Sequence, residues 1–336
     1  MPKVSVIVPV YNVEKYIERC ARSLFGQTLQ DMEYIFVNDC SPDRSIEVLQ
    51  RVLNEYPERV AQVKIVNLDI NGGVSAARQH GTDIATGEYL IHCDPDDWVE
   101  LNMYETLYNT AKNGGVDFVM CDFCYVTDDS AVHTVNCCPD EFTGPGLLRS
   151  ISGASFHRLH GSLCNKLIKS TCYIDNVHFP EGVNFCEDVS VLFQLLPRIK
   201  KIVYVNRTLY YYNRMNESSI TSVININKSQ TFFDWLEENI IPSDNPEVSD
   251  CGKACIMSLI LNMSLAPLGL TSSQFRSKFG RYRSYLKYIK MQVTPTLLLQ
   301  KFSCIVDYKL ACGLFNVLVS VKCYLSRLAG KRKYNG

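Results

Sequence analysis

The stretch GEYLIHCDPDDW, residues 87–98, joins an apolar segment to a cluster of acids. Residues 88–93 predict a strand, and the carboxylates of Asp94, Asp96 and Asp97 follow within four positions. Carboxylates this close repel one another, so the cluster costs stability unless a positive group lies among them. The segment is therefore either a solvated turn or the site of a cation, and the rest of the sequence has to decide between the two.

Strand patterns alternate with helix patterns around this stretch. Apolar runs predict four strands, at residues 3–10, 33–39, 63–69 and 87–94. Apolar residues at helical spacing predict helices at 13–27, 45–56, 71–85 and 101–113. Three strand–helix–strand repeats indicate an α/β fold, with a mostly parallel sheet and helices on both faces. Ligands bind such sheets beyond the carboxyl ends of the strands, where this sequence carries turn-forming and acidic residues.

The pattern changes in the second part of the chain. Strands are predicted at 116–126 and 201–214, and helical pieces at 161–173 and 183–199 on either side of a loop. Beyond residue 225 the pattern is helical. We therefore predict a sheet domain at residues 1–220, with halves at 1–115 and 116–220, and a helical C-terminal region at residues 221–336.

Composition narrows the class of protein. The chain has 336 residues, 46% of them hydrophobic, and a formal net charge of −1. It can bury a sizeable core, and its length suggests about two domains. A near-neutral chain has no overall positive field, so no nucleic-acid partner is expected. The N-terminus lacks the pattern of a secretory signal and no apolar stretch is long enough to span a bilayer, so we expect a cytoplasmic protein.

Fifteen cysteines are spread along the chain, and without a secretory signal they indicate reduced thiols. Cys121, Cys124, Cys137 and Cys138 have a spacing that zinc sites permit. Cys121 and Cys124 nevertheless lie in a predicted strand, where alternation points their side chains to opposite faces. Buried thiols are therefore favoured over a zinc site.

The acidic cluster suits a divalent cation. Hard cations take oxygen ligands, and Mg²⁺ is often bound by one or two carboxylates together with the phosphates of a substrate. Asp94 and Asp96 are two positions apart at a predicted strand end. Asp39 ends the second predicted strand, and a glycine-rich loop follows the third. Together these features indicate a nucleoside diphosphate as the ligand.

Four ordered segments resemble family 2 glycosyltransferases with the GT-A fold. They are VSVIVPVYNVEKYIERCARSL (4–24), FVNDCSPDRS (36–45), NGGVSAARQHG (71–81) and GEYLIHCDPDDW (87–98). The resemblance is close over residues 3–125 and looser to about residue 221. It implies a nucleotide-binding half at 1–115 and an acceptor half at 116–220. It also implies inverting transfer of a sugar from a nucleotide-sugar donor, of the bacterial surface-polysaccharide type.

The resemblance implies a donor site at the strand ends. Its members are Pro9, Val10, Tyr11, Asn12, Asp39, Asn71, Gly72, Arg78 and Asp94. The turn at 9–12 would wall the base and ribose, with uridine favoured, and Asp39 would accept a hydrogen bond from the base. The guanidinium of Arg78 suits a phosphate or a buried carboxylate. As alternatives, Asp39 could only form a turn and Arg78 could only be a surface ion-pair partner.

The resemblance also implies a metal and a base. Asp96 would bind Mn or Mg directly, and Asp94 would bind it through water or lie near the ribose. Asp97 would orient the loop, or would cap a helix after Trp98. Asp188 at a predicted helix start would be the general base, with Glu187 supporting it. Acids enriched at a helix N-terminus for reasons of the helix dipole are the alternative for this pair.

Three further residues are candidates for contact with the acceptor or a closing loop. Trp98 could stack on a sugar ring. Lys166 lies in the NKL segment on the acceptor side, and Arg214 precedes Ser218 and Ser219 in a segment that could close over the diphosphate.

The tail suggests where the protein acts. An uncharged segment at 310–321 is followed by the basic cluster at 331–333. This combination predicts peripheral contact with the inner face of the cell membrane, or a helix packed on the catalytic domain with a solvated basic end. The expected partners are a nucleotide-sugar donor and a glycan or lipid-linked saccharide acceptor.

Other functions are weighed against this one. A nucleotidyltransferase should carry a glycine-rich, basic loop after the first strand, where this chain has PVYNVEKY. A catalytically silent nucleotide-sugar-binding subunit would not need Asp188 and the acidic loop. A dinucleotide dehydrogenase is disfavoured because no Gly-x-Gly-x-x-Gly follows the first strand.

Overall fold

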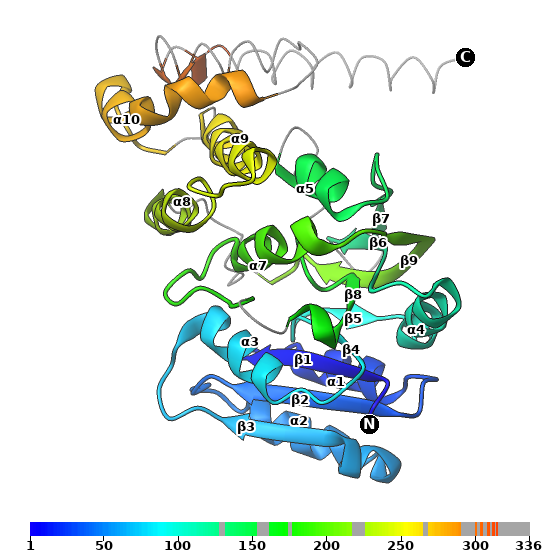
Figure 1. Cartoon of the computed structure of the whole chain (residues 1–336). Helices are drawn as coiled ribbons and strands as arrows, with labels where there is room; N and C mark the ends of the chain where they lie inside the picture. Colours follow the sequence, from blue (N-terminus) through cyan, green and yellow to red (C-terminus); the bar gives the residue numbers. More distant parts are fainter. Residues whose placement is uncertain are drawn as a thin grey trace, which may run out of the picture. The chain divides into compact units, whose positions relative to one another are not determined.

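The computed structural model describes residues 1–127, 132–152, 161–173, 177–216, 226–264 and 268–289, together with 300, 303–304, 308–309, 311–312 and 314. The chain forms two compact units, one of residues 1–151 and 155–248 and the other of residues 152–154 and 249–336. The first unit contains the sheet (Figure 1). The sequence-based division at residue 220 stays a prediction.

Four parallel strands make up one side of the sheet. They lie in the order β3-β2-β1-β4, so β1 pairs with both β2 and β4. All of β1 and all but the last residue of β2 are buried, as expected for strands covered on both faces. The predicted doubly wound parallel arrangement is confirmed here. The bounds are β1 (Val4–Val10), β2 (Met32–Asn38), β3 (Val63–Asn67) and β4 (Tyr89–His92).

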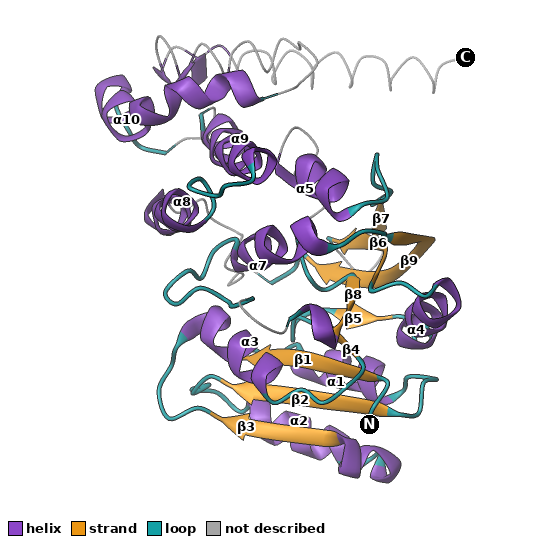
Figure 2. Cartoon of the chain, in the orientation of Figure 1, coloured by secondary structure: helices purple, strands orange, loops and turns teal. Residues whose placement is uncertain are grey.

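The connecting helices cover both faces of these strands, as predicted. Figure 2 shows α1 and α2 behind β1 to β3 and α3 in front of them. The helices are α1 (Ile17–Phe25), α2 (Ser45–Leu53), α3 (Gly73–Asp83) and α4 (Met103–Gly114), with a 3₁₀ turn η1 (Pro57–Gln62) before β3. Helix α4 ends where Gly115 adopts a left-handed conformation with φ of 56°, which glycine takes without strain.

The remaining strands extend the sheet with mixed directions. Beyond β4 the order is β8-β6-β9-β5, and β7 pairs with the outer part of β6. Strand β8 runs antiparallel to β4 and β6, whereas β6 and β9 are parallel. The bounds are β5 (Trp98–Val99), β6 (Phe118–Val126), β7 (Val132–Val135), β8 (Lys166–Lys169) and β9 (Val203–Asn213). The strands predicted at 116–126 and 201–214 are thus confirmed.

Two local predictions are wrong. The segment 161–173 was expected to be helical, but it contains β8 and the short 3₁₀ turn η2 (Ser170–Cys172). Strand β8 pairs with β4 and β6 along its two edges and three of its four residues are buried, so the segment lacks the alternation that marks a half-buried strand. No helix follows Trp98 directly either, because Trp98 lies in β5 and Asn102 is the N-cap of α4. Asp97 is therefore not a helix cap.

The other helices follow the predicted pattern. The helix expected at 183–199 is present as α7 and η3, and the described residues beyond 225 include α8, α9 and α10. No helix in the described part of the chain is long and apolar enough to cross a membrane. The apolar segment 310–321 and the basic cluster 331–333 fall almost entirely outside the described residues. The bounds are α5 (Gly144–Ser152), α7 (Glu187–Leu195), η3 (Leu196–Arg198), α8 (Ile226–Asn239), α9 (Pro246–Met263), α10 (Ser272–Phe279) and η4 (Gly280–Tyr288).

Candidate active site

The carboxyl ends of β1 and β2 are tied together by short polar contacts. Asn12 and Cys40 both adopt left-handed backbone conformations, with φ of 54° and 55°, where the chain turns out of the sheet. The backbone N–H of Asn12 donates to Ser41 Oγ at 2.8 Å. Of the four residues expected to wall a nucleotide, Pro9 and Val10 are buried in β1, whereas Tyr11 and Asn12 are exposed. Among these four, Tyr11 and Asn12 are the residues with exposed side chains, and their contact with a nucleotide stays a prediction.

Asp39 holds the glycine-rich loop at the start of α3. Its carboxylate is 3% exposed and accepts from the backbone N–H groups of Gly72 at 2.7 Å and Gly73 at 2.9 Å. The amide of Asn71 donates to the Asp39 carbonyl at 3.0 Å. A negative side chain at a helix N-terminus is stabilised by the exposed N–H groups and the helix dipole. The turn-forming role of Asp39 is therefore present, and contact with a base stays a prediction.

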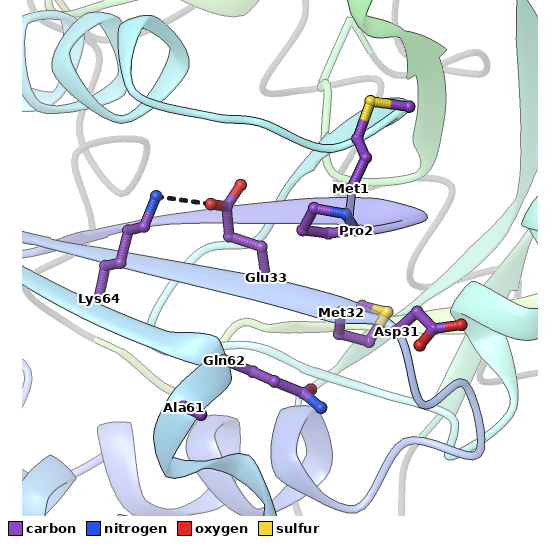
Figure 3. A pocket seen from close by; sticks show the side chains of 8 residues that line it. All are labelled: Met1, Pro2, Asp31, Met32, Glu33, Ala61, Gln62 and Lys64. Carbon is purple, nitrogen blue, oxygen red and sulfur yellow. Dashed lines mark hydrogen bonds and ion pairs between the residues drawn. The ribbon is translucent and has the colours of Figure 1, made fainter.

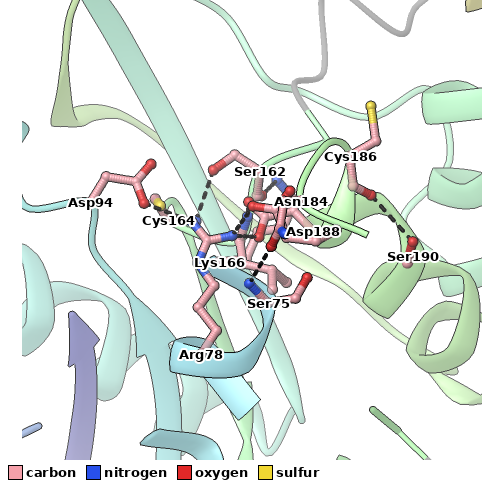
Figure 4. A network of polar contacts seen from close by, with 12 residues as sticks. Ser75, Arg78, Asp94, Ser162, Cys164, Lys166, Asn184, Cys186, Asp188 and Ser190 are labelled. Carbon is pink, nitrogen blue, oxygen red and sulfur yellow. Dashed lines mark hydrogen bonds and ion pairs between the residues drawn. The ribbon is translucent and has the colours of Figure 1, made fainter. Parts of the chain in front are cut away.

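Arg78 lies at the centre of a buried network of acids (Figure 4). It is on α3 and only 2% exposed, so the surface ion-pair alternative is wrong. Its Nη2 donates to Asp94 Oδ1 at 2.6 Å, and its Nη1 donates to Glu187 Oε1 at 2.8 Å and to Asp188. Of the two partners expected for this guanidinium, the structure shows the buried carboxylate. Three acids, one from the loop after β4 and two from α7, thus share one cation.

This network controls the ionisation of the α7 acids. Burial raises the pKa of Glu187 to about 7, against the opposing effect of the Arg78 charge. Burial also raises the pKa of Asp188, again opposed by Arg78. Asp188 is oriented by a second contact, since its Oδ2 accepts from the backbone N–H of Leu163 at 3.0 Å. Three carboxylates share one guanidinium, and burial together with the charge of Asp188 favours the protonated form of Glu187.

The second part of the chain also holds the acidic loop. Asp97 is buried and accepts from Tyr210 Oη at 2.5 Å and from the backbone N–H of Asn213 at 2.8 Å. These contacts fix the loop to β9, which is the orienting role predicted for Asp97. Asp96 accepts from the amide of Asn216 at 2.7 Å. Burial, with the nearby Asp94 charge, raises the pKa of Asp96 to about 6.

Asp94 and Asp96 fit a metal that is shared with a substrate. Within the described residues, no group of three or more His, Cys, Asp or Glu side chains could hold a metal by itself. A cation bound jointly by protein and diphosphate needs only one or two carboxylates. Arg78 contacts one oxygen of Asp94, and the raised pKa of Asp96 reflects a buried carboxylate beside a second negative charge. A divalent cation would relieve that repulsion.

The three acceptor-side candidates are already in contact with the protein. The Trp98 ring stacks on Tyr211 with centroids 5.3 Å apart, and the Arg19 guanidinium lies 3.2 Å from its centroid. Lys166 is fully buried, and its Nζ donates to Ser162 O at 2.5 Å and to Asn165 Oδ1 at 2.7 Å. Both side chains are thus held by protein neighbours, and contact of Trp98 or Lys166 with an acceptor stays a prediction.

Arg214 lies over the Tyr125 ring, with its guanidinium 5.5 Å from the centroid. Ser218 and Ser219, its expected partners, lie outside the described residues. Direct contacts thus join Arg78, Asp94, Glu187 and Asp188, and others join Asp39, Asn71 and Gly72. No described contact joins Trp98 or Arg214 to either group.

Sequence reasoning missed the residues that support the acids. Tyr210, Asn213 and Asn216 hold the acidic loop from β9 and the residues after it. Asn184 lies against Gly73, where an added Cβ would be 2.4 Å from Asn184 Oδ1. The φ of 81° at Gly73 favours glycine for the same position. These polar residues lie beside aromatic or acidic segments of the sequence. They follow no periodic pattern, so local sequence patterns did not single them out.

A hollow of about 330 Å³ lies elsewhere, at the amino ends of β2 and β3 (Figure 3). Its polar contact joins Lys64 Nζ to Glu33 Oε1 at 2.7 Å. Parallel sheets of this type bind ligands at the opposite, carboxyl ends of their strands. The hollow is therefore separate from the acidic network. Its lining residues are Met1, Pro2, Asp31, Met32, Glu33, Ala61, Gln62 and Lys64.

Sequence comparisons match the part of the chain that carries these strand ends. The family model described as Glycosyl transferase family 2 matches residues 5–136. "Uncharacterized glycosyltransferase EpsJ" of Bacillus subtilis (strain 168) is 32% identical over 230 residues, which cover 66% of this chain and 64% of EpsJ. "Minor teichoic acid biosynthesis protein GgaB" of the same organism is 28% identical over 242 residues, 70% of this chain and 25% of GgaB. The chain thus spans just under two thirds of EpsJ and a quarter of GgaB.

Solved structures confirm the fold. TarS residues 1–349 from S. aureus, in complex with UDP-GlcNAc, superposes with a TM-score of 0.70 at 20% identity and covers 94% of this chain and 91% of that chain. The mannosyltransferase PcManGT from Pyrobaculum calidifontis, in complex with GDP-Man and Mn²⁺, has a TM-score of 0.56 at 14% identity, with coverages of 94% and 87%. The predicted GT-A architecture is therefore present. The family model matches the residues that carry Asp39, Arg78 and the acidic loop, and the match to EpsJ extends over 230 residues, so the chain belongs to glycosyltransferase family 2.

Proposed function

We propose that this protein is an inverting glycosyltransferase that moves a sugar from a UDP-sugar to a hydroxyl of a glycan or lipid-linked acceptor. The observation that carries the proposal is the buried network of Arg78, Asp94, Glu187 and Asp188 at the carboxyl ends of the strands. The family supports the reaction class. TarS was solved with UDP-GlcNAc, and GgaB is named for teichoic acid synthesis, which supports a UDP-sugar and a surface polymer.

Asp188 is the proposed general base. Inverting transfer requires a carboxylate that takes the proton of the attacking hydroxyl, and no nucleophile on the enzyme. Asp188 lies in the first turn of α7, with one oxygen on Arg78 and the other on the Leu163 N–H. These two contacts set the direction of its lone pairs. A raised pKa strengthens Asp188 as a proton acceptor while it is ionised.

Glu187 and Arg78 support this base. A proton on Glu187 leaves more of the Arg78 charge to Asp188, and that charge opposes the rise of the Asp188 pKa caused by burial. Asp39 holds the backbone of Gly72 and Gly73 at the α3 N-terminus by accepting from both of their N–H groups.

The proposed metal, Mn or Mg, would be held by Asp96 and Asp94. A divalent cation there would neutralise charge on the leaving diphosphate. The turn at residues 9–12 would contact the nucleotide through Tyr11 and Asn12, whose side chains are exposed.

The proposed division of labour follows the chain. Residues 1–115 bind the donor, residues 116–220 bind the acceptor, and residues 221–336 bring the enzyme to the inner face of the cell membrane. This location suits an acceptor that is lipid-linked.

Calorimetric titration of UDP tests the donor and the metal together. UDP should bind with Mn²⁺ present and lose affinity with chelator, and Asp96→Ala should abolish the effect of metal. GDP is the control nucleotide, because binding of GDP instead would keep the fold and reject the donor. If neither nucleotide bound to folded protein, the proposal of an active transferase would be wrong.

A further inference from the structure

The charged residues of this chain are divided unevenly along the sequence. Residues 251–336 contain fourteen Lys and Arg and a single acid, Asp307, which gives a net charge of +13. Residues 1–250 contain twenty Lys and Arg and thirty-four Asp and Glu, which gives −14. The overall charge of −1 hides this division. Because the second structural unit begins near residue 249, the division follows the two units closely.

In the described part of the second unit, the positive charge is concentrated on α10 and η4. Arg276, Arg283 and Lys287 are exposed and Lys278 is half-buried. The chain has no acid between residues 251 and 306, so nearby sequence supplies no carboxylate to neutralise them. We call these four residues, with Tyr285 and Tyr288, the basic–tyrosine surface.

The tyrosines form a row beside these cations. Residues three apart in a 3₁₀ helix lie above one another, and Tyr282, Tyr285 and Tyr288 of η4 have this spacing. Their successive ring centroids are 5.8 Å and 6.3 Å apart. Tyr282 is buried, whereas Tyr285 and Tyr288 are partly exposed. Lys287 Nζ lies 5.0 Å from the centroid of Tyr288.

We infer that the basic–tyrosine surface binds the anionic phospholipid headgroups of a membrane. A negatively charged bilayer attracts basic residues at its surface, and tyrosine has an apolar ring and a polar hydroxyl that suit the headgroup level. The same bilayer repels the acidic residues 1–250. This inference specifies the membrane contact proposed for the C-terminal region and does not depend on the transfer reaction.

A soluble polyanion is the competing occupant. Cations alone are sufficient to bind a phosphate polymer, and its affinity would not depend on neighbouring rings. Arg283 and Lys287 alternate with the half-exposed Tyr285 and Tyr288 on η4, directly after the cations of α10. This arrangement favours the membrane, because the rings can enter the interface while the cations contact headgroups.

Vesicle sedimentation with the full chain tests the inference. We expect binding to phosphatidylcholine vesicles that contain one part in three of phosphatidylglycerol, little binding to phosphatidylcholine alone, and loss at high salt. The variant R276Q/K278Q/R283Q/K287Q should bind several hundredfold more weakly, since each basic residue near the surface contributes roughly fivefold. The double variant Y285S/Y288S should also weaken binding to the vesicles.

A matched control removes the same charge from the first unit. The exposed residues Lys200, Lys201, Arg207 and Lys228 are replaced by glutamine, and vesicle binding should not fall. Circular dichroism and the unfolding midpoint show whether each variant is folded. Equal losses in the two charge variants, or no binding of the wild type to anionic vesicles at low salt, would overturn the inference.

Inorganic polyphosphate is the probe for the competing occupant. If the wild type bound polyphosphate but not the vesicles, or if Y285S/Y288S kept full vesicle binding, the occupant would be a soluble polyanion and the inference would be wrong. Vesicle binding can be measured without donor or acceptor. A failure of UDP to bind would therefore reject the proposed function and leave this result unaffected.

Discussion

Residues 1–115 and residues 116–216 contribute to the site in different ways. In the first part the strands pair in parallel, and its buried acid Asp39 finds its partners locally, on Gly72 and Gly73. The second part supplies the partners of distant charges. Glu187 and Asp188 meet Arg78, and Tyr210 meets Asp97, across more than 100 positions of sequence. Asp39 of the first part is thus held by residues of the same part. Arg78 and Asp97, in contrast, are held by residues of the second part.

Of the substitutions considered, replacing Asp188 by asparagine should have the largest effect on the transfer reaction. We expect transfer to fall about 10²- to 10⁴-fold, because asparagine keeps the shape but cannot take a proton. UDP should still bind, since Asp188 contacts Arg78 and Leu163 and lies outside the proposed donor wall. UDP release with a sugar acceptor measures the rate, and the exposed Asp244→Asn is the control. Unchanged turnover would show that Asp188 is not the base.

Replacing Arg78 by alanine should break the link between the two parts. Glu187 and Asp188, with side chains 13% exposed, and the partly exposed Asp94 would lose their shared buried cation, which costs about 3–5 kcal/mol of the free energy of unfolding. Arg22→Ala is the matched control, because Arg22 also pairs with two acids but is 38% exposed, and such surface pairs contribute about 0–1 kcal/mol. Urea unfolding measures both variants.

The acids of the network provide a second check on the Arg78 result. Adding Asp188→Asn to Arg78→Ala removes one of the unpaired charges and should restore part of the lost stability. If Arg78→Ala and Arg22→Ala destabilised the protein equally, the network would be solvated in solution, contrary to its burial in the structure.

The sequence allowed the first part to be predicted because its signals are local. Each strand is an apolar run bounded by turn residues, and each connecting helix has its own apolar face. The order of these elements is sufficient to specify a parallel sheet. The positions of Asp39, Asp94 and Asp96 at one edge of the sheet followed from that topology.

The second part resisted prediction because its structure depends on pairing at long range. Strand β8 has only four residues, three of them buried, so neither alternation nor helical spacing marks it. Its conformation comes from β4 and β6, which lie about 50 to 80 positions before it. The meeting of Arg78 with Glu187 likewise depends on two elements that no local pattern connects. The family resemblance, and not periodicity, identified Asp188.

Glu187 should make stability depend on pH. Its folded pKa of about 7 lies above the ordinary value of 4.5, so the folded state holds a proton that the unfolded state has lost between these values. The contribution of Glu187 to the free energy of unfolding is fully present below pH 4.5 and is lost as the pH rises to about 7. The wild type should therefore lose about 3 kcal/mol relative to Glu187→Gln across this range. Parallel curves of unfolding free energy against pH would show that Glu187 titrates normally.

Two neighbouring tyrosines test how firmly β9 holds the acidic loop. Tyr210→Phe removes one of the two donors to the buried Asp97 and should cost about 1–3 kcal/mol of unfolding free energy, because the carboxylate has no access to water there. Tyr211→Phe removes the hydroxyl that contacts Glu100, which is partly exposed and can be hydrated instead, so it should cost less than about 1 kcal/mol. Urea unfolding of the two variants measures the difference. Equal costs would mean that the loop is held by its own backbone and that the second part of the chain supports the site only through α7.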